Sequence, residues 1–451
     1  MGPSSCETDD LPTRTQPGHS IDNAQADGVG LFWVSPEERF HELEVGGAIG
    51  RANDCALRLE GPSVSRHHAL LQKNGSVWML RDLGSKNGTF VNGSRQELAP
   101  LSIQDTVRAG DWVGVVCAMP AAAIEQRKFF GEVAPGIIFS ATTLATLGDV
   151  AALAKRNTSV LIEGETGTGK ELLARAIHEL SGRGGPLVAV NCAAIPEGIA
   201  EAELFGYKKG AFSGAVDTAP GLIAAADGGT LFLDEIVELR PAIQSKLLRV
   251  LEDHAVRPLG TTRSVRVDFR LVAAAQSSLE KLVYTGAFRA DLYARLHGVA
   301  LQLPPLRERR QETLRLLCNA IEQALGQRPT FDSRAVERLC MYAWPYNVRE
   351  INQLAHLFTV SGKHHFSVED LPQRMTEPRS ALRSGIDAAE SNDASESTRR
   401  QAWLARHAVE LHRLKRALQQ CNGNVSEAAR ALSMPRHRAR RLLEAEEAIS
   451  K

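Results

Sequence analysis

Gly164-Glu165-Thr166-Gly167-Thr168-Gly169-Lys170 is the stretch that decides the fold of the central part of the chain. An apolar run at 159–162 precedes it and indicates a buried strand, and residues 171–178 follow it with the apolar spacing of a helix. Glycines let backbone N–H groups converge on phosphates, the helix N-terminus adds positive potential, and Lys170 neutralises the terminal phosphates. The order of strand, glycine loop and helix therefore predicts a phosphate cradle rather than a glycine-rich turn of no consequence.

A second nucleotide motif begins at Gly228, where an apolar run ends in Asp234 and Glu235, 64 residues after Lys170. Two acids at the end of a strand are weak evidence for a nucleotide site when they occur alone. Together with a phosphate cradle at this spacing, they are strong evidence for one. We expect Asp234 to hold Mg²⁺, directly or through water, and Glu235 to polarise the attacking water. The two motifs together predict an ATPase that uses ATP and Mg²⁺.

Length and composition bound the remaining possibilities. The 451 residues exceed the usual size of one domain, so two to four domains are expected, and 43% apolar residues suffice for real cores. No apolar run approaches the roughly 20 residues of a membrane span. Seven scattered cysteines without paired spacing favour a reducing cytoplasm over a disulfide framework or a zinc site.

Composition shifts along the chain indicate five segments. Residues 1–27 are polar, carry no secretion pattern and are expected to be disordered. Short alternating runs between turn signals predict an all-β sandwich over 28–119. Strands that alternate with helices over 135–373 predict an α/β domain with a parallel sheet. Residues 374–400 have the composition of a linker, and 401–451 are expected to be all-α.

Three ordered motifs occupy the loops of the expected sandwich: Gly50-Arg51, Ser-Val-Ser-Arg-His-His-Ala at 63–69, and the Asp-to-Gly stretch at 82–93. With these motifs the segment resembles a forkhead-associated domain, a reader of phosphothreonine peptides. An arginine fork and hydroxyl donors suit a dianionic phosphate. The alternative is a sandwich that merely packs against the ATPase.

The resemblance assigns roles to individual loop residues. It implies that the phosphate is held by Arg51 and Ser65, and that phosphate or peptide backbone is contacted by Arg66, Lys86 and Asn87. It further implies that the loops are braced by His68, Gly88 and Asn92.

An aromatic residue between glycines lies between the two nucleotide motifs, in Gly210-Ala211-Phe212-Ser213-Gly214-Ala215. Together with those motifs, it makes 135–373 resemble the AAA+ module, a P-loop ATPase with a helical lid, of bacterial enhancer-binding proteins, the activators of sigma-54 RNA polymerase. In that family the loop is Gly-Ala-Phe-Thr-Gly-Ala and touches sigma-54 directly. An exposed aromatic flanked by glycines suits a mobile contact probe; the alternative is a buried Phe in a tight turn.

The same resemblance assigns nucleotide and catalytic roles. Nucleotide contacts are implied for Gly164, Glu165, Thr166, Gly167, Thr168, Gly169, Lys170, Glu171, Gln276 and Arg349. Asn191 matches the residue that restrains the catalytic Glu until the γ-phosphate is sensed. Arg289 and Arg295 match arginine fingers, which act across a subunit boundary and therefore imply a ring, expected to be hexameric.

Some positions depart from the family pattern. Ser213 replaces Thr, which keeps the hydroxyl and loses a methyl, so we expect a weaker sigma-54 contact. Glu171 stands where most phosphate loops have Ser or Thr, so Mg²⁺ must find its ligands elsewhere. Ala275 and Gln276 stand where Thr-Asn is usual, and Tyr346 replaces a Gly in the lid. We expect hydrolysis to persist but to be slow or tightly regulated.

The last segment carries the excess positive charge. Residues 401–451 contain 10 Lys or Arg against 5 Asp or Glu, which predicts an anionic partner for this segment. A short Ala-rich helix, a turn at Ser433 and a basic helix beginning at Pro435 resemble the Fis-type helix-turn-helix of the same activators. DNA contacts are predicted from Arg436, His437, Arg438, Arg440 and Arg441. A solvated basic helix is the alternative.

The sequence thus predicts a cytoplasmic, three-part transcription activator. We expect the tail to bind upstream DNA as a dimer, the sandwich to sense a phosphothreonine protein, and a ring of ATPase domains to press Phe212 on sigma-54 polymerase during open-complex formation. The Asp pocket of a two-component receiver is not evident, which favours a Ser/Thr kinase input. Two alternatives stay open: a phosphopeptide- and DNA-binding regulator with little or no sigma-54 remodelling, and a general AAA+ DNA remodeller, which leaves 210–215 unexplained.

Overall fold

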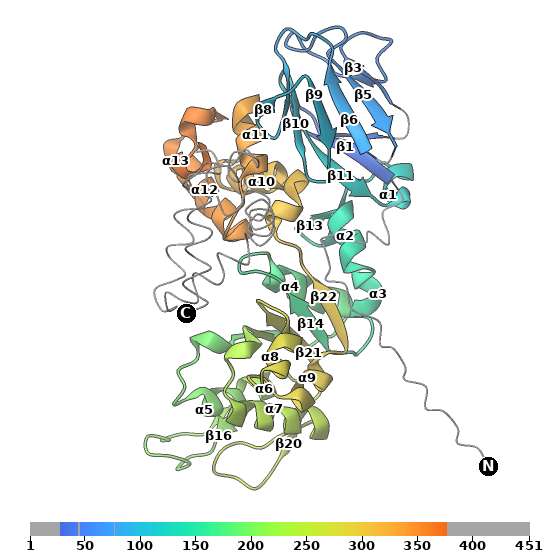
Figure 1. Cartoon of the computed structure of the whole chain (residues 1–451). Helices are drawn as coiled ribbons and strands as arrows, with labels where there is room; N and C mark the ends of the chain where they lie inside the picture. The colour runs from blue at the N-terminus through green and yellow to red at the C-terminus, as the bar shows by residue number, and fades with distance from the viewer. Residues whose placement is uncertain (1–27, 44–45, 76, 377–451) are drawn as a thin grey trace, which may run out of the picture. The chain divides into compact units, whose positions relative to one another are not determined.

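The computed structural model describes residues 28–43, 46–75 and 77–376 (Figure 1). The described residues up to Met375 form one compact unit. The disorder expected over 1–27, most of the expected linker and the whole basic tail lie outside the described residues. Within the described part, none of the helices has the length and apolar character that crossing a membrane requires.

Residues 28–119 form two stacked antiparallel sheets, apart from one short parallel pair, which confirms the predicted sandwich (Figure 1). One sheet has the order β2-β1-β11-β10-β7-β8, with β1 at Gly28–Ser35, β2 at Arg39–Glu42, β7 at Thr89–Val91, β8 at Ser94–Arg95, β10 at Thr106–Ala109 and β11 at Trp112–Met119. The other has the order β4-β3-β5-β6-β9, with β3 at Gly47–Gly50, β4 at Leu57–Arg58, β5 at Ala69–Asn74, β6 at Val77–Asp82 and β9 at Leu98–Leu101.

Strand β1 is buried on both faces. Leu31 and Trp33 point into the sandwich core, while the alternate residues Phe32 and Val34 belong to a core shared with the helical lid at the end of the ATPase. Strand β11, its antiparallel partner, is buried along its whole length. Because side chains alternate across a strand, a strand that is apolar at every position needs a partner on each side.

A short connector joins the sandwich to the ATPase. It contains α1 (Ala121–Glu125), the hairpin of β12 (Phe130–Ala134) and β13 (Ile137–Ser140), α2 (Ala141–Leu147) and α3 (Val150–Ala154). Ser140 caps α2, because its hydroxyl accepts the backbone N–H of Thr143.

The ATPase is built on a five-stranded parallel sheet of order β15-β18-β21-β14-β22, which confirms the predicted α/β fold. The strands are β14 (Val160–Glu163), β15 (Leu187–Asn191), β18 (Thr230–Asp234), β21 (Arg270–Ala275) and β22 (Val299–Gln302). The helices are α4 (Lys170–Ser181), α5 (Ala200–Phe205), α6 (Leu222–Ala225), α7 (Pro241–Asp253), α8 (Leu279–Tyr284) and α9 (Ala290–Leu296). Two small hairpins add β16 (Gly206–Tyr207) with β17 (Ala219–Pro220) and β19 (Ala255–Val256) with β20 (Val265–Arg266).

The lid is helical, with one short parallel strand pair. Its elements are α10 (Thr313–Leu325), β23 (Thr330–Phe331), α11 (Ser333–Met341), α12 (Asn347–Ser361), β24 (His365–Phe366) and α13 (Gln373–Thr376). Leu317, Val336 and Trp344 are fully buried between these helices.

The sandwich packs directly against the lid. Arg108 of β10 donates from Nε to Glu337 of α11 at 2.9 Å, with side chains only 11% and 6% exposed, and its guanidinium lies 3.7 Å from the ring centre of Phe90. Gln104 accepts the backbone N–H of Arg310 at 3.0 Å. These polar contacts fix one orientation of the sandwich on the lid, which an apolar contact alone does not specify.

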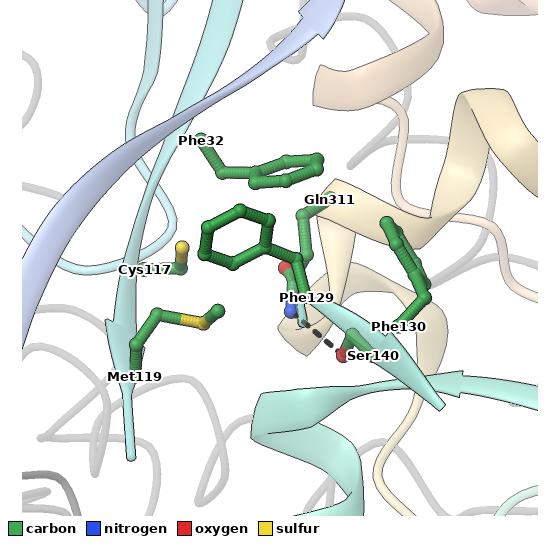
Figure 2. A pocket seen from close by; sticks show the side chains of 7 residues that line it. All are labelled: Phe32, Cys117, Met119, Phe129, Phe130, Ser140 and Gln311. Carbon is green, nitrogen blue, oxygen red and sulfur yellow. Dashed lines mark hydrogen bonds between the residues drawn. The ribbon is translucent and has the colours of Figure 1, made fainter. Parts of the chain in front are cut away.

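A small pocket, too narrow to admit a water molecule, lies in this seam (Figure 2). It is lined by Phe32, Cys117, Met119, Phe129, Phe130, Ser140 and Gln311. The Phe32 ring makes tilted or edge contacts with Phe129 at 5.7 Å and Phe130 at 5.6 Å, and Gln311 donates to the Ser140 hydroxyl at 3.2 Å. The pocket contains no residue of the phosphate cradle, so it is a feature of the apolar seam.

Candidate functional site: the carboxyl edge of the ATPase sheet

Most of the predicted catalytic residues meet at one edge of the parallel sheet. Asn191 ends β15, Asp234 ends β18, Gln276 follows β21, and the phosphate loop follows β14. The backbone N–H of Gly164 donates to Ala275 at 3.1 Å and ties the loop to the neighbouring strand end. In open α/β sheets, ligands bind outside the carboxyl ends of the strands, so this edge is the candidate nucleotide site.

Lys170 opens helix α4 and lies inside the loop. Its Nζ donates to the carbonyl oxygens of Gly164 at 2.7 Å and Glu165 at 3.1 Å, and the residue is only 7% exposed. Burial lowers the pKa of Lys170, while the carboxylates of Asp234 and Glu235 oppose that shift. The lysine of the first motif and the acids of the second therefore lie close enough to interact electrostatically.

Gly167 has a structural requirement for glycine. Its φ is +77°, and a Cβ there would lie 2.3 Å from the Tyr346 carbonyl oxygen and 3.1 Å from Cβ of Arg349. Val348 of the lid donates its backbone N–H to Gly167 at 2.9 Å. The lid backbone thus touches the phosphate loop and places Arg349 beside it, with the Tyr346 side chain 59% exposed.

Glu165 in the middle of the loop is held from the lid side. Both Nη atoms of Arg307 donate to its carboxylate, at 2.8 and 2.7 Å, and Asn347 donates to the same group at 3.3 Å. The hydrogen bonds from Arg307 are the main reason why the pKa of Glu165 lies below its usual value. The sequence analysis did not predict this pairing.

Arg309 is a second contact that the sequence analysis missed. It is 2% exposed and donates to the Thr168 carbonyl at 2.7 Å and to Glu312 at 2.9 Å. Glu312 in turn accepts the Thr143 hydroxyl of the connector at 2.6 Å. The sequence signal that could have indicated these contacts is the cluster of charged residues at 307–312. Charged side chains that become buried require hydrogen-bond or ion-pair partners within the protein.

The two acids of the second motif have different surroundings. Asp234 is partly buried, and burial raises its pKa while Lys170 opposes the shift. Its Oδ1 accepts the backbone N–H of Glu235 at 3.0 Å. Glu235 has a left-handed backbone, with φ at +52°, and its carboxylate accepts a hydrogen bond from Nε2 of Gln276 at 2.6 Å. A non-glycine residue in this conformation is typical of functional sites.

Asn191 is placed beside Asp234 by the register of β15 and β18. Its side-chain oxygen accepts the backbone N–H groups of Ala193 and Ala194, at 2.9 and 3.1 Å. In the described part of the chain it makes no hydrogen bond with Glu235. The hydrogen bond to the Glu235 carboxylate comes instead from Gln276, on the opposite side of β18.

Arg289 and Arg295 flank and occupy helix α9 and are both exposed. The Arg289 guanidinium binds Asp291, at 3.0 and 2.7 Å, and the Ser245 hydroxyl, at 3.0 Å. In the described part of the chain, neither arginine forms a hydrogen bond with residues 164–171.

Residues 210–215 lie in the loop that connects β16 to β17, and residues 212–214 of this loop are exposed while Ala215 is buried. The backbone N–H of Gly210 donates to the Ala215 carbonyl at 2.9 Å and closes the loop. Gly210 and Gly214 both have positive φ. The Phe212 side chain is 44% exposed and makes an edge contact with Tyr207 at 5.1 Å. The alternative of a buried Phe is therefore wrong.

The loops of the sandwich bring the predicted phosphopeptide residues together. The Ser65 hydroxyl accepts the backbone N–H of Lys86 at 3.0 Å, and Asn87 donates to the Ser63 carbonyl at 2.7 Å. Arg51 donates its backbone N–H to the Ser65 carbonyl at 3.1 Å, and the side chains of Arg51 and Arg66 are exposed. The three loops thus form one polar surface with exposed positive charge.

His68 and Asn92 support these loops from behind. His68 is fully buried; its Nδ1 accepts the backbone N–H of Ser65, and its Nε2 contacts the Gly88 carbonyl at 3.2 Å. Burial lowers the pKa of His68. Asn92 donates to Asp105 at 2.7 Å and accepts the backbone N–H of Thr106. Arg436 to Arg441 lie outside the described residues.

Comparison with known proteins agrees with this architecture. Four family models match in order: FHA domain over 47–110, sigma-54 interaction domain over 137–302, AAA+ ATPase lid domain over 307–385, and bacterial regulatory protein, Fis family, over 405–437. The predicted fold classes are confirmed, including that of the tail, which the Fis family model supports. The match to an AAA+ domain with its lid implies nucleotide binding and ATPase activity.

Several curated proteins are similar to the chain. The sigma54-dependent transcriptional regulator SfnR of Pseudomonas fluorescens is 50% identical over 217 residues, 47% of this chain and 59% of the relative. The anaerobic nitric oxide reductase transcription regulator NorR of Citrobacter koseri is 42% identical over 291 residues, 63% of this chain and 57% of the relative. The transcriptional regulatory protein GlrR of Escherichia coli is 39% identical over 285 residues, 62% of this chain and 60% of the relative.

Each match spans less than two thirds of the relative's own length. In this chain the FHA domain precedes the sigma-54 interaction domain. From the ordered matches and these relatives, we conclude that the chain carries an FHA domain, a sigma-54 interaction domain with its AAA+ lid and a Fis-family segment, and that it is similar to sigma-54-dependent transcriptional regulators.

Proposed function

We propose that this protein binds upstream DNA, senses phosphothreonine signals, and uses ATP hydrolysis to remodel sigma-54 RNA polymerase for open-complex formation. The proposal gives each part of the chain one task. The observation that supports it is that one domain has both the candidate nucleotide site, at the carboxyl edge of its sheet, and an exposed Phe212 in a glycine-flanked loop.

The nucleotide edge supports ATP hydrolysis. Backbone N–H groups of the loop and Lys170 would bind the phosphates, with Arg349 approaching from the lid. Glu235 would polarise the attacking water. Asp234 fits a Mg²⁺ ligand, since it is a partly buried carboxylate beside Lys170, and Mg²⁺ prefers carboxylate and phosphate oxygens. When bound, the ion would neutralise charge on the phosphates.

The exposed arginines support a ring. An arginine finger must reach the nucleotide of a neighbouring copy, and Arg289 and Arg295 are exposed and make no hydrogen bond with their own phosphate loop in the described residues. We infer a hexamer, with one nucleotide at each subunit boundary. The tail is proposed to bind DNA as a dimer, with its basic helix in contact with the DNA.

The Phe212 loop supports a contact with sigma-54. An aromatic side chain that is nearly half exposed buries substantial apolar area when a partner covers it, and the flanking glycines let the loop change conformation at low cost. Ser213 is exposed beside it and keeps the hydroxyl expected at this position. The loop therefore suits a contact that is made and released as nucleotide is cleaved.

The sandwich supports phosphopeptide sensing. A dianionic phosphate would be bound by the exposed guanidinium of Arg51 and the hydroxyl of Ser65, on loops that His68 holds together. A Ser/Thr kinase pathway would supply that phosphate.

Trapping the full-length protein with ADP and aluminium fluoride tests the central claim. The assembled ring, verified by light scattering, should co-elute with sigma-54, and ATP should drive open-complex formation by sigma-54 polymerase. Phe212→Ala should lose both properties. Tyr284→Ala removes another aromatic, 94% exposed on α8, and should keep them. An assembled, nucleotide-bound ring that does not associate with sigma-54 would favour the regulator without remodelling activity.

A further inference from the structure

Gln276 occupies the position from which the catalytic carboxylate is held. Its Nε2 donates to Oε1 of Glu235 at 2.6 Å, a short, charge-assisted hydrogen bond. Gln276 is exposed and follows β21, where the family pattern has a shorter Asn. The residue therefore has both the donor and the length to reach the carboxylate.

The strand order explains why two residues compete for this task. Strand β18, which ends in Asp234, lies between β15 and β21, so Glu235 has one neighbour from each side, Asn191 and Gln276. The side-chain oxygen of Asn191 caps the following helical turn by accepting two backbone N–H groups, which fixes the orientation of its amide. In the described part of the chain that amide makes no hydrogen bond with Glu235. The hydrogen bond to Glu235 comes from the β21 side.

The length of the side chain is decisive on that side. Residues Ala273 to Ala275 are fully buried and hold β21 in register, so the backbone at 276 has little freedom to move toward Glu235. An Asn at 276 would draw its amide back by one methylene, about 1.5 Å, and the present 2.6 Å contact would exceed hydrogen-bond length. Gln at position 276 thus makes a hydrogen bond to Glu235 that the usual Asn is too short to make.

We propose that Gln276, rather than Asn191, restrains Glu235, and that the terminal phosphate of a nucleoside triphosphate releases the restraint by binding the free N–H of the Gln276 amide and turning that amide away from Glu235. The hydrogen bond orients the carboxylate toward β21 and occupies the oxygen that accepts it. A carboxylate that polarises water needs a free, correctly aimed oxygen.

The remaining donor of Gln276 is suited to phosphate. An amide NH₂ group has two N–H bonds, and in the described part of the chain Gln276 uses one of them, for Glu235. The edge of the sheet that carries Gln276 also carries the phosphate loop, joined through the hydrogen bond of Gly164 to Ala275. One side chain can therefore respond to the terminal phosphate and act on the catalytic carboxylate. This inference rests on the proposed ATP hydrolysis.

The test measures ATP turnover and binding of a fluorescent ADP by the full-length protein. Gln276→Ala should raise kcat about fivefold, the size expected for loss of one hydrogen bond to an exposed charged group, with unchanged ADP affinity. Gln276→Asn should behave like Gln276→Ala, because it keeps the amide but not the reach. Gln276→Glu has the length but lacks the NH₂ donor, so it should also release Glu235. Gln302→Ala, at the exposed end of β22, which β14 separates from β21, should leave turnover unchanged.

The outcomes separate this inference from the proposed function. Adding Glu235→Gln to Gln276→Ala should remove the gained turnover. If the unmodified protein binds ADP but hydrolyses no ATP while Gln276→Ala does, the restraint is supported and the proposed activity of the unmodified protein fails. If Gln276→Ala binds ADP normally and its turnover equals or falls below that of the unmodified protein, the restraint is refuted. If the ATP turnover of Gln276→Asn differs from that of Gln276→Ala, the argument from side-chain length is refuted.

Discussion

Removing Glu337 should loosen the sandwich from the lid. Glu337→Ala leaves Arg108 as a charge without its partner in a site where that side chain is only 11% exposed. Breaking a buried pair from one side costs about 3–5 kcal/mol, because the remaining charge stays desolvated. The perturbation therefore acts on one contact between two domains that are far apart in sequence.

Two features of the structure place the expected loss near the lower end of that range. Oε1 of Glu337 is buried without a hydrogen-bond partner, so the intact pair is not fully satisfied. The Phe90 ring lies 3.7 Å below the guanidinium and continues to stabilise the cation after the carboxylate is removed. We expect a loss of about 3 kcal/mol, roughly a 150-fold change in the folded-to-unfolded ratio.

The assay is urea unfolding of the full-length protein followed by tryptophan fluorescence. Trp33 and Trp112 report on the sandwich core, and Trp344 reports on the lid. The double replacement Arg108→Met with Glu337→Leu should recover most of the loss, because a buried pair replaced by apolar side chains is often neutral.

A matched surface pair provides the control. Arg328 is 55% exposed and lies 3.8 Å from Glu38, so Arg328→Ala should cost less than about 1 kcal/mol. Glu337→Ala and Arg108→Ala could each lower the free energy of unfolding by no more than this control, and the loss in the double alanine variant could equal the sum of the two losses. In that case the pair does not join the domains and the reasoning is wrong.

Three further predictions concern the other sites. Arg51→Ala should abolish binding of a phosphothreonine peptide in titration calorimetry and leave ATP turnover intact; an unchanged peptide affinity would refute the role of Arg51. Burial, and secondarily Arg39, lowers the pKa of His41 from 6.5 to about 4, so the sandwich should lose stability as the pH falls from 6.5 to 4, because the unfolded chain takes up the proton first. Since the side chain is only partly buried and solvent screens its charge, the expected loss is about 1–2 kcal/mol. His41→Gln, which keeps an acceptor for the Trp33 indole N–H, should flatten this slope in urea midpoints. Arg307→Ala should weaken fluorescent ADP binding by up to about fivefold, since a partly exposed pair contributes at most ~1 kcal/mol; an unchanged Kd would show that the pair does not position the loop.

Local patterns predicted the elements that carry the chemistry. The apolar run at 159–162, the glycine loop and the apolar spacing after Lys170 correspond to β14, the loop and α4. The expected strand before Asp234 corresponds to β18, and the alternating runs of the sandwich correspond to its strands. These predictions succeed because backbone freedom at glycine and the periodicity of burial depend on residues close in sequence.

Contacts between distant segments were beyond these patterns. The sequence placed Phe32 in an alternating run, and nothing near it in sequence indicates that its outward face packs against the lid. Likewise, the sequence separates Arg309 from Thr168 by 141 residues, and no periodicity reports that they share a hydrogen bond.

The amino-acid sequence by itself determined which residues carry charge, hydroxyl and amide groups, and in what order the phosphate loop, the acids and the exposed Phe212 follow one another. Only the tertiary structure decided which neighbour holds Glu235. Strand order places β18 between β15 and β21, and both neighbours offer an amide. The choice of Gln276 depends on side-chain reach and on the prior engagement of Asn191, which are properties of packed strands and not of any local run of residues.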